Sequence, residues 1–507
     1  MKAFKRILIV LAGLIVLVAL FYAEEDWRGK RAWEKHKSEW QAKGEHFNLS
    51  SLVPPPVPDE QNFAMTPIVF SSYSFILTRD GKVIPDRRRD TNYVDRLRMS
   101  LALNDESPTN GIGNWSAGKT SDLKIWQNYY RTLAATNNEF PVAPRSQTPA
   151  TDVLLALSKY DSTIEELRKA SQLPYSRFPL NYDNKNPAII LLPHLADLRD
   201  CTRVLQLRAI AELQNGQSEK ALDDIKLMLR LINSVRTEPI LISQVVRIAN
   251  LQTTLQPVWE GLAGHAWSDE QLVALDAEFA KLDFLADYEF SMRAERVFDI
   301  GTIEYLRHMR LIEKIRDIAH PTPDIGIVIR TSDKISFYLG PSGWIDLREL
   351  RISSFLMQYY FPVANTDLQT ISPDAVRSAD EAFRVETHNS QKGDFSERLF
   401  LPVLGGAAKK FAFAQNTVNL ARVACALERY HLAHGTYPET LDTLVPQFIE
   451  KLPHDIIGGQ PLHYRRTSDG KFLLYSVGWN ETDDGGQVVL KPDGSVDREK
   501  GDWVWKN

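Results

Sequence analysis

The chain has 507 residues and a net charge of −5, and hydrophobic residues make up 43% of it. This composition is typical of a globular protein and excludes a disordered or fibrous chain. A chain of this length is expected to divide into about two to four folded units, because single hydrophobic cores stop growing with length. Basic and acidic residues are mixed without a basic stripe, so nucleic acid is not an expected partner.

Residues 1–23 have the pattern of a transmembrane anchor. Lys2, Lys5 and Arg6 precede an unbroken apolar run over residues 7–23, and two glutamates follow. This run is near the short end of what crosses a hydrocarbon core about 30 Å thick, and its basic flank predicts a cytoplasmic N-terminus. A cleaved signal peptide is the alternative, but Phe21 stands where cleavage favours a small residue. We expect a single-pass anchor in a bacterial inner membrane, with the body in the periplasm.

The next two segments differ in character. Residues 24–58 are predicted to form a juxtamembrane helix and then a proline-rich spacer, because the run Leu-Val-Pro-Pro-Pro-Val-Pro at 52–58 favours a stiff polyproline II conformation. Residues 59–150 are rich in Asn, Asp, Ser and Gly. They predict a mixed region of irregular structure with short strands and helices.

Residues 151–400 predict a helical domain, because apolar residues recur there at helical spacing. The clearest helical hairpin joins residues 192–213 to 218–232 through Asn215-Gly216-Gln217, and further helices are expected after Pro239, Ser268 and Phe284. The hairpin resembles one tetratricopeptide helix pair. No second copy follows at the required period, so a multi-helix bundle or solenoid is favoured. A connector is expected over residues 321–343, and helices over 344–360 and 373–386.

Residues 401–507 predict a small α+β domain. A long helix from Lys409 is expected to end at Gly435, because Pro438 lies just beyond it. A short second helix at 439–446 and strands at 462–466 and 472–477 should follow, and the turn Ser468-Asp-Gly470 separates the strands.

The order of these elements resembles the globular domain of type II secretion major pseudopilins. The matching residues are Tyr430, Gly435, Tyr437, Pro438, Leu441, Leu444, Pro453, Asp455, Gly459, Tyr464, Tyr475, Ser476 and Gly478. The resemblance covers about the last fifth of the chain. The whole chain resembles uncharacterised membrane-anchored proteins of planctomycete and verrucomicrobial type that carry such a module.

Two features depart from the pseudopilin pattern. The N-terminus lacks both the Gly-Phe cleavage site and the glutamate at the fifth position of the mature helix, so the module resembles a borrowed domain and not a pilus subunit. In the family, a loop after the strands binds calcium. The resemblance therefore implies a calcium site at Asn480, Asp483 and Asp484, although the same residues also form ordinary turns.

The sequence contains no recognisable catalytic motif. Gly-x-Ser-x-Gly, the phosphate loop, the dinucleotide fingerprint and His-Glu-x-x-His are all missing from it. His431 and His434 are three residues apart on one helix face and could ligate a metal, but the sequence indicates no third ligand. They are therefore interpreted as polar residues that interact with exposed carbonyls at a helix end. Cys201 and Cys425 are interpreted as buried free thiols, with a periplasmic disulfide as the alternative.

These patterns together predict a mainly α protein. It has an N-terminal transmembrane helix, a helical body and a pseudopilin-like α+β module at the C-terminus. We expect a non-enzymatic, membrane-tethered envelope protein, a scaffold with envelope or secretion proteins as partners. The alternative is an envelope hydrolase or ligand-binding protein whose site is assembled from dispersed residues.

Overall fold

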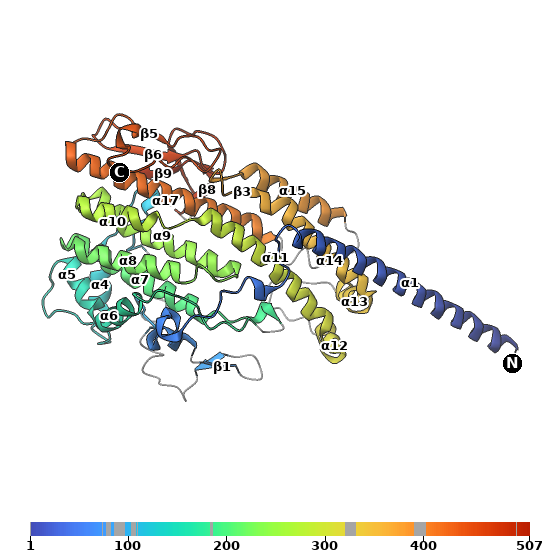
Figure 1. Cartoon of the computed structure of the whole chain (residues 1–507). Helices are drawn as coiled ribbons and strands as arrows, with labels where there is room; N and C mark the ends of the chain where they lie inside the picture. Colours follow the sequence, from blue (N-terminus) through green and yellow to red (C-terminus); the bar gives the residue numbers. More distant parts are fainter. Residues whose placement is uncertain are drawn as a thin grey trace.

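The computed structural model is mainly helical, with small sheets (Figure 1). It describes residues 2–506, except for 74, 78–82, 86–96, 103–107, 109, 183–185, 320–330, 390–401 and 493. The predicted mainly helical class with small C-terminal sheets is confirmed. Residues 321–330 of the predicted connector lie outside the described residues.

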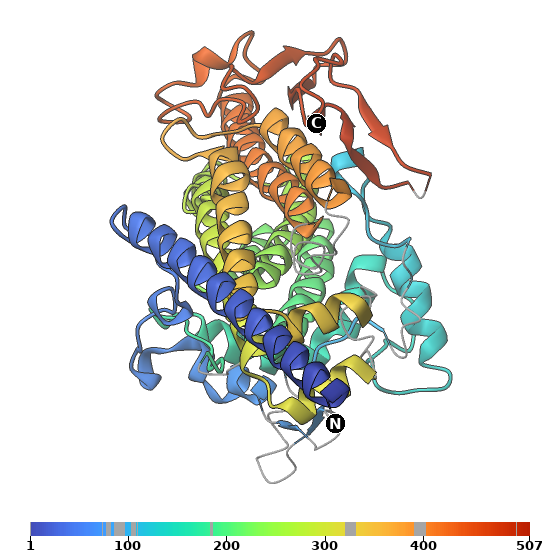
Figure 2. The same ribbon diagram turned by 90° about the vertical axis from the view of Figure 1, so that its right-hand side faces the viewer.

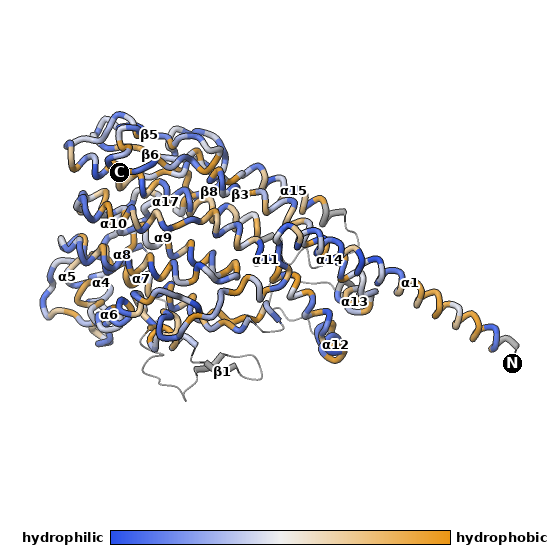
Figure 3. The backbone as a smooth tube through the Cα atoms, viewed as in Figure 1, coloured by the Kyte–Doolittle hydropathy of each residue, from blue (hydrophilic) through white to orange (hydrophobic). Residues whose placement is uncertain are grey.

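Helix α1 is a single continuous helix, Lys2–Gln41. Its first half carries exposed apolar side chains and contacts little else, and Figure 3 shows this half in orange. It is the one helix among the described residues that is long and apolar enough to cross a membrane. The apolar anchor segment that the sequence predicts therefore forms the outer half of a longer helix.

The second half of α1 packs directly on the body. It lies along α14, Ser342–Phe355, and Figure 2 shows α1 in blue crossing in front of the body. His36 Nε2 lies 2.9 Å from Ser353 Oγ, and the Trp33 side chain is buried. Helix α1 thus reaches the body before the proline segment begins.

The proline segment is not a projecting spacer. The backbone oxygen of Pro54 accepts a hydrogen bond of 2.9 Å from Arg177 Nε, so this segment lies against the body. The sequence interpretation, a body held away from the anchor by stiff prolines, is therefore wrong. The reason is that local polyproline preference says nothing about tertiary contacts made by the preceding helix.

The predicted mixed region forms short elements and one longer helix. They are α2 (Pro67–Phe70), β1 (Phe75–Leu77), β2 (Val83–Pro85) and α4 (Leu123–Leu133), with 3-10 turns between them. The apolar residues of α2 and α4 share a core with α5 (Pro149–Leu157), α6 (Asp161–Ala170) and one face of α7 (Pro193–Gln214). The region is thus built onto the first helices of the body.

The helical body continues with long helices whose ends follow local turn chemistry. Gly216 adopts φ +70° between α7 and α8, and Ser268 caps α10 through a reciprocal pair of hydrogen bonds with Gln271. The predicted helix starts near residues 218, 241, 269 and 284 are confirmed. The helices are α8 (Ser218–Ser234), α9 (Leu241–Ala263), α10 (Asp269–Phe279), α11 (Phe284–His308), α12 (Leu311–Ala319), α13 (Thr331–Leu339), α14 and α15 (Pro373–Asn389).

The C-terminal region begins with α17, Pro402–His434, which ends at Gly435 with φ +75° as predicted. A 3-10 turn, Leu441–Leu444, replaces the predicted second helix. The main sheet has the order β5-β6-β9, all antiparallel, and β7 pairs with β8 beside it. The strands are β5 (His463–Arg466), β6 (Phe472–Ser476), β7 (Val488–Leu490), β8 (Val496–Gly501) and β9 (Trp503–Lys506).

Helix α17 belongs to the largest core of the molecule. Its apolar residues pack with those of α8 to α11 on one side and with Trp503 and Trp505 of β9 on the other. The C-terminal region is therefore joined to the helical body through a shared core, and the division of the chain near residue 400 stays a prediction. Cys201 and Cys425 are both buried and free, as expected.

Candidate functional site

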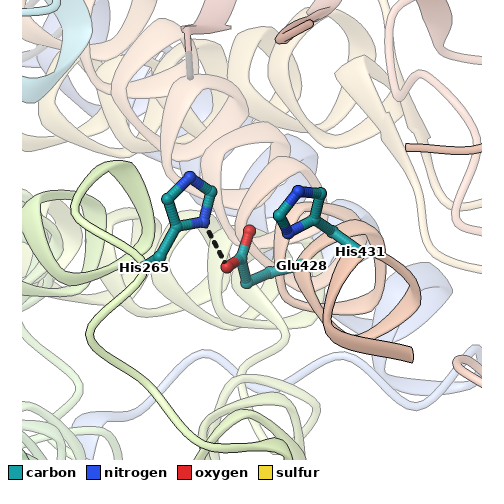
Figure 4. Close-up of side chains that lie close together, drawn as sticks. All are labelled: His265, Glu428 and His431. Carbon is teal, nitrogen blue, oxygen red and sulfur yellow. Dashed lines mark hydrogen bonds and ion pairs between the residues drawn. The ribbon is translucent and has the colours of Figure 1, made fainter. Parts of the chain in front are cut away.

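His265, Glu428 and His431 form a cluster where the loop after α9 meets α17 (Figure 4). One ligand atom from each side chain lies within 4.8 Å of the other two. It is the one group of three or more His, Cys, Asp or Glu side chains with this spacing among the described residues. The cluster therefore joins the helical body to the C-terminal region.

Local backbone geometry places each of the three groups. Gly264 ends α9, and His265 follows with a positive φ of 50°, a conformation that non-glycine residues rarely adopt. This turn directs the ring toward α17. Glu428 and His431 are three residues apart on α17 and so lie on the same face of that helix.

Both oxygens of the buried Glu428 carboxylate accept a hydrogen bond. His265 Nδ1 donates to one oxygen at 2.7 Å, and the Tyr437 hydroxyl donates to the other at 2.8 Å. The rings of His265 and His431 stack at 4.9 Å, and His431 stacks on Tyr437 at 4.7 Å. His431 Nδ1 is buried without a hydrogen-bond partner, so one polar atom of the cluster is left unsatisfied.

Two imidazole nitrogens and one carboxylate oxygen are a donor set that Zn²⁺ accepts in proteins, with water as a fourth ligand. His265 would exchange its Nδ1 proton for the ion, and His431 Nδ1 would gain the partner that it lacks. The same geometry also suits a structural contact without metal, because Glu428 is already fully hydrogen-bonded. In both cases the cluster fastens α17 to the end of α9.

The two histidines singled out in the sequence have different surroundings. His434 Nδ1 lies 3.0 Å from the Tyr430 carbonyl oxygen one turn earlier, which is the helix-end interaction expected for it. His431 instead faces His265. Sequence reasoning missed this cluster because His265 and Glu428 are 163 residues apart, and a lone histidine after Gly264 carries no motif.

The residues of the predicted calcium loop are engaged in local turns. Asn480 Nδ2 donates to Asp484 at 2.8 Å, and Asp483 accepts from the Tyr475 hydroxyl at 3.0 Å and from the Gly485 amide at 2.9 Å. The backbone amide hydrogen bond from Gly485 and the Tyr475 hydroxyl hold the pKa of Asp483 below its usual value. Asp502 accepts backbone amides of the same loop.

Calcium binding at Asn480, Asp483 and Asp484 stays a prediction. It requires the loop carboxylates to turn from these hydrogen bonds toward one ion, since Ca²⁺ takes about six to eight oxygens. A melting temperature that rises on adding calcium and falls with a chelator supports it. No shift in either direction would overturn it.

A buried polar triad lies elsewhere in the body. The Tyr73 hydroxyl is 2.6 Å from His194 Nδ1, and His194 Nε2 is 2.8 Å from Glu238 Oε1. Both His194 and Glu238 are buried, and burial raises the pKa of Tyr73 well above its usual value. The three side chains are hydrogen-bonded to one another, and two of them are buried, so we interpret this triad as a core contact.

A cleft of about 560 Å³ lies between the helical body and the C-terminal region. Its walls carry glutamine amides and cations, and Glu499 is the one acid among its lining residues and pairs with Lys409. Gln252 Nε2 is buried there without an acceptor. The cleft therefore offers hydrogen bonds and positive charge, and the residues that line it contain no pair suited to general acid and base catalysis.

No family model, curated protein or solved structure matches this chain.

Proposed function

We propose that this protein is a non-enzymatic, membrane-tethered scaffold of the bacterial envelope, with its body on the outer side of the inner membrane. The observation that carries this proposal is the continuity of α1. One helix has an exposed apolar half that suits a bilayer and a second half that is part of the folded body. The basic residues at its start support a cytoplasmic N-terminus.

The contacts of α1 support a body that is fixed to the anchor. Glu45, just after α1, binds Arg293 at 3.0 Å and Arg296 at 2.9 Å, and both arginines lie on α11. Trp344 Nε1 of α14 donates to Glu25 of α1 at 2.8 Å. Such an arrangement suits a protein that presents surfaces at a set position above the bilayer.

We also propose that the region from α17 onward is a pseudopilin-like module that serves a secretion or envelope assembly. The support is the resemblance of its residues together with the order of long helix, Gly435, 3-10 turn and antiparallel strands. Without the processing signals of pseudopilins, this module would act as a docking domain at the end of the body.

Crosslinking in native membranes, followed by identification of the captured proteins, tests the scaffold role. We expect components of secretion or envelope assembly in the captured set. Recovery of none of them would remove the secretion role. Protease digestion of spheroplasts tests the topology, because the body should be cleaved in intact spheroplasts. A body that resists protease until the membrane is lysed would overturn it.

The ligand-binding alternative is favoured by one observation, the unpartnered Gln252 Nε2 in the cleft between body and module. The amides and cations there suit an acidic oligosaccharide or peptide. Thermal shifts with fragments of these two classes test it. A shift that is lost in Gln252→Leu supports binding in the cleft, and no shift with either class would remove it.

A further inference from the structure

Helix α12 presents its apolar face outward. Leu311, Ile312 and Ile315 are 67%, 60% and 51% exposed, and their spacing places them on one face of the helix. Helices of globular proteins normally turn such a face toward the core. Helix α12 is therefore oriented opposite to most surface helices, with its apolar face pointing away from the core.

The polar face of α12 holds it against the protein. Asp317 accepts a hydrogen bond of 2.8 Å from the buried Lys334 of α13 and one of 3.0 Å from the Tyr338 hydroxyl. Lys314 Nζ donates to the Arg307 carbonyl oxygen at the end of α11 at 2.8 Å. These contacts fix the orientation of α12. Its apolar face therefore points outward because specific polar contacts hold the helix in place.

Helix α13 continues the exposed apolar surface and joins it to the anchor. Ile335 and Leu339 are exposed on α13, and the Leu339 carbonyl oxygen accepts a hydrogen bond of 2.7 Å from the Tyr22 hydroxyl of α1. Tyr22 is the last residue but one of the unbroken apolar run at 7–23, where the proposed spanning segment ends. Figure 1 shows α12 and α13 on the side of the body from which α1 departs.

We propose that α12 and α13 lie on the bilayer that α1 spans, with the face formed by Leu311, Ile312 and Ile315 inserted among the lipid headgroups and upper acyl chains. This inference rests on the proposed membrane-spanning role of α1. Spanning helices tilt by about 20° on average and up to about 40°, which gives the anchor freedom to bring α12 to the surface. Arg316 is exposed beside the apolar face and suits lipid phosphate.

Site-specific fluorescence quenching in proteoliposomes tests the inference on the full chain. A fluorophore is attached to Ile315→Cys, and the vesicles contain phosphatidylethanolamine, phosphatidylglycerol and a nitroxide-labelled lipid. The native thiols do not interfere, because Cys201 and Cys425 are fully buried. We expect nitroxide lipid to cause a clear loss of fluorescence at this position.

Two further variants provide matched controls. Leu432→Cys labels an exposed leucine, 46% accessible, in the last turn of α17, and α17 ends on the side of the body away from α1. It should lose no fluorescence. Val16→Cys labels the exposed apolar half of α1 and should be quenched at least as strongly as Ile315→Cys.

The outcomes separate the inference from the proposed function. Quenching at Val16→Cys without quenching at Ile315→Cys overturns the surface contact of α12 and leaves the anchor intact. Absence of quenching at Val16→Cys overturns the spanning role of α1. Disulfide dimers through Ile315→Cys, without lipid quenching, would make this face an interface between two copies and also overturn the inference.

Discussion

Gly29 of α1 and Gly343 of α14 lie at a crossing so close that no side chain fits between the two backbones. A Cβ on Gly29 would lie 2.1 Å from the Gly343 carbonyl oxygen, and a Cβ on Gly343 would lie 2.0 Å from the Glu25 carbonyl oxygen. Each of these atoms belongs to a backbone and cannot swing away. The crossing of α1 and α14 therefore depends on two glycines.

Gly343→Ala should separate α1 from α14 and lower the free energy of unfolding by about 1–3 kcal/mol, the range for overpacked sites. Chemical denaturation in detergent measures this change in the free energy of unfolding. Protease sensitivity after Gln41 is a second readout. Gly406→Ala in α17 is the matched control, because no atom lies within 4 Å of its built Cβ. Equal stability of the two variants would contradict the close crossing.

Glu45→Ala should destabilise the protein by about 3–5 kcal/mol, because it leaves the buried Arg296 charge without its carboxylate. Burial already lowers the pKa of Arg296. The double variant Glu45→Ala/Arg296→Met removes that charge and keeps apolar contact with Phe47 and Phe361. We expect it to recover most of the loss, and a double variant as unstable as the single one would contradict this account.

Stability should fall as pH rises because of Glu349 on α14. Burial, followed by the nearby charge of Glu304, raises the pKa of this carboxyl to about 9 from an ordinary 4.5. Between those values the folded state holds a proton that the unfolded state has lost, so the free energy of unfolding decreases with pH by up to about 1.4 kcal/mol per unit.

Glu349→Gln removes this titration. The variant should match the parent near pH 4.5 and become increasingly more stable than it toward pH 9, as denaturant titrations at several pH values would measure. Glu60→Gln is the control for the same substitution at an exposed position. A constant difference between Glu349→Gln and the parent at all pH values would contradict the prediction.

We expect Zn²⁺ to raise the melting temperature through His265, Glu428 and His431, since binding only to the folded state stabilises it. His431→Ala should abolish the shift. His434→Ala should keep it, because that ring is exposed and interacts with the Tyr430 carbonyl oxygen. No shift in the parent protein, or the same shift in both variants, would show that the cluster is a hydrogen-bonded contact without metal.

Helix ends were predictable from sequence because their chemistry is local. Gly216 and Gly435 end helices in left-handed conformations, and Ser268 caps the helix that follows it. The strand pair around the turn Ser468-Asp-Gly470 was equally accessible, and in the structure Gly470 adopts φ +82° between the paired strands β5 and β6. Such signals need only a few neighbouring residues.

The contacts between distant segments were not predictable from one sequence. The sequence pattern places Gly343 at the end of a connector, although it forms the contact with α1. The apolar spacing of Leu311 and Ile315 indicates a helix but not which way its apolar face points. His265 carries no motif, and its relation to Glu428 arises only when α9 and α17 pack together. Each of these depends on tertiary packing, which local propensity does not encode.

The rigid join between α1 and α14 changes how this molecule would meet a partner. A body on a flexible tether samples many orientations, whereas one docked on its own spanning helix keeps a single face toward the lipid plane. With α1 in a bilayer as proposed, the remaining freedom of the body would be a limited tilt, lateral diffusion and rotation about the membrane normal. Encounters with another membrane-embedded protein would then take place in two dimensions and at one fixed height, which relaxes the orientational constraint that slows association in solution.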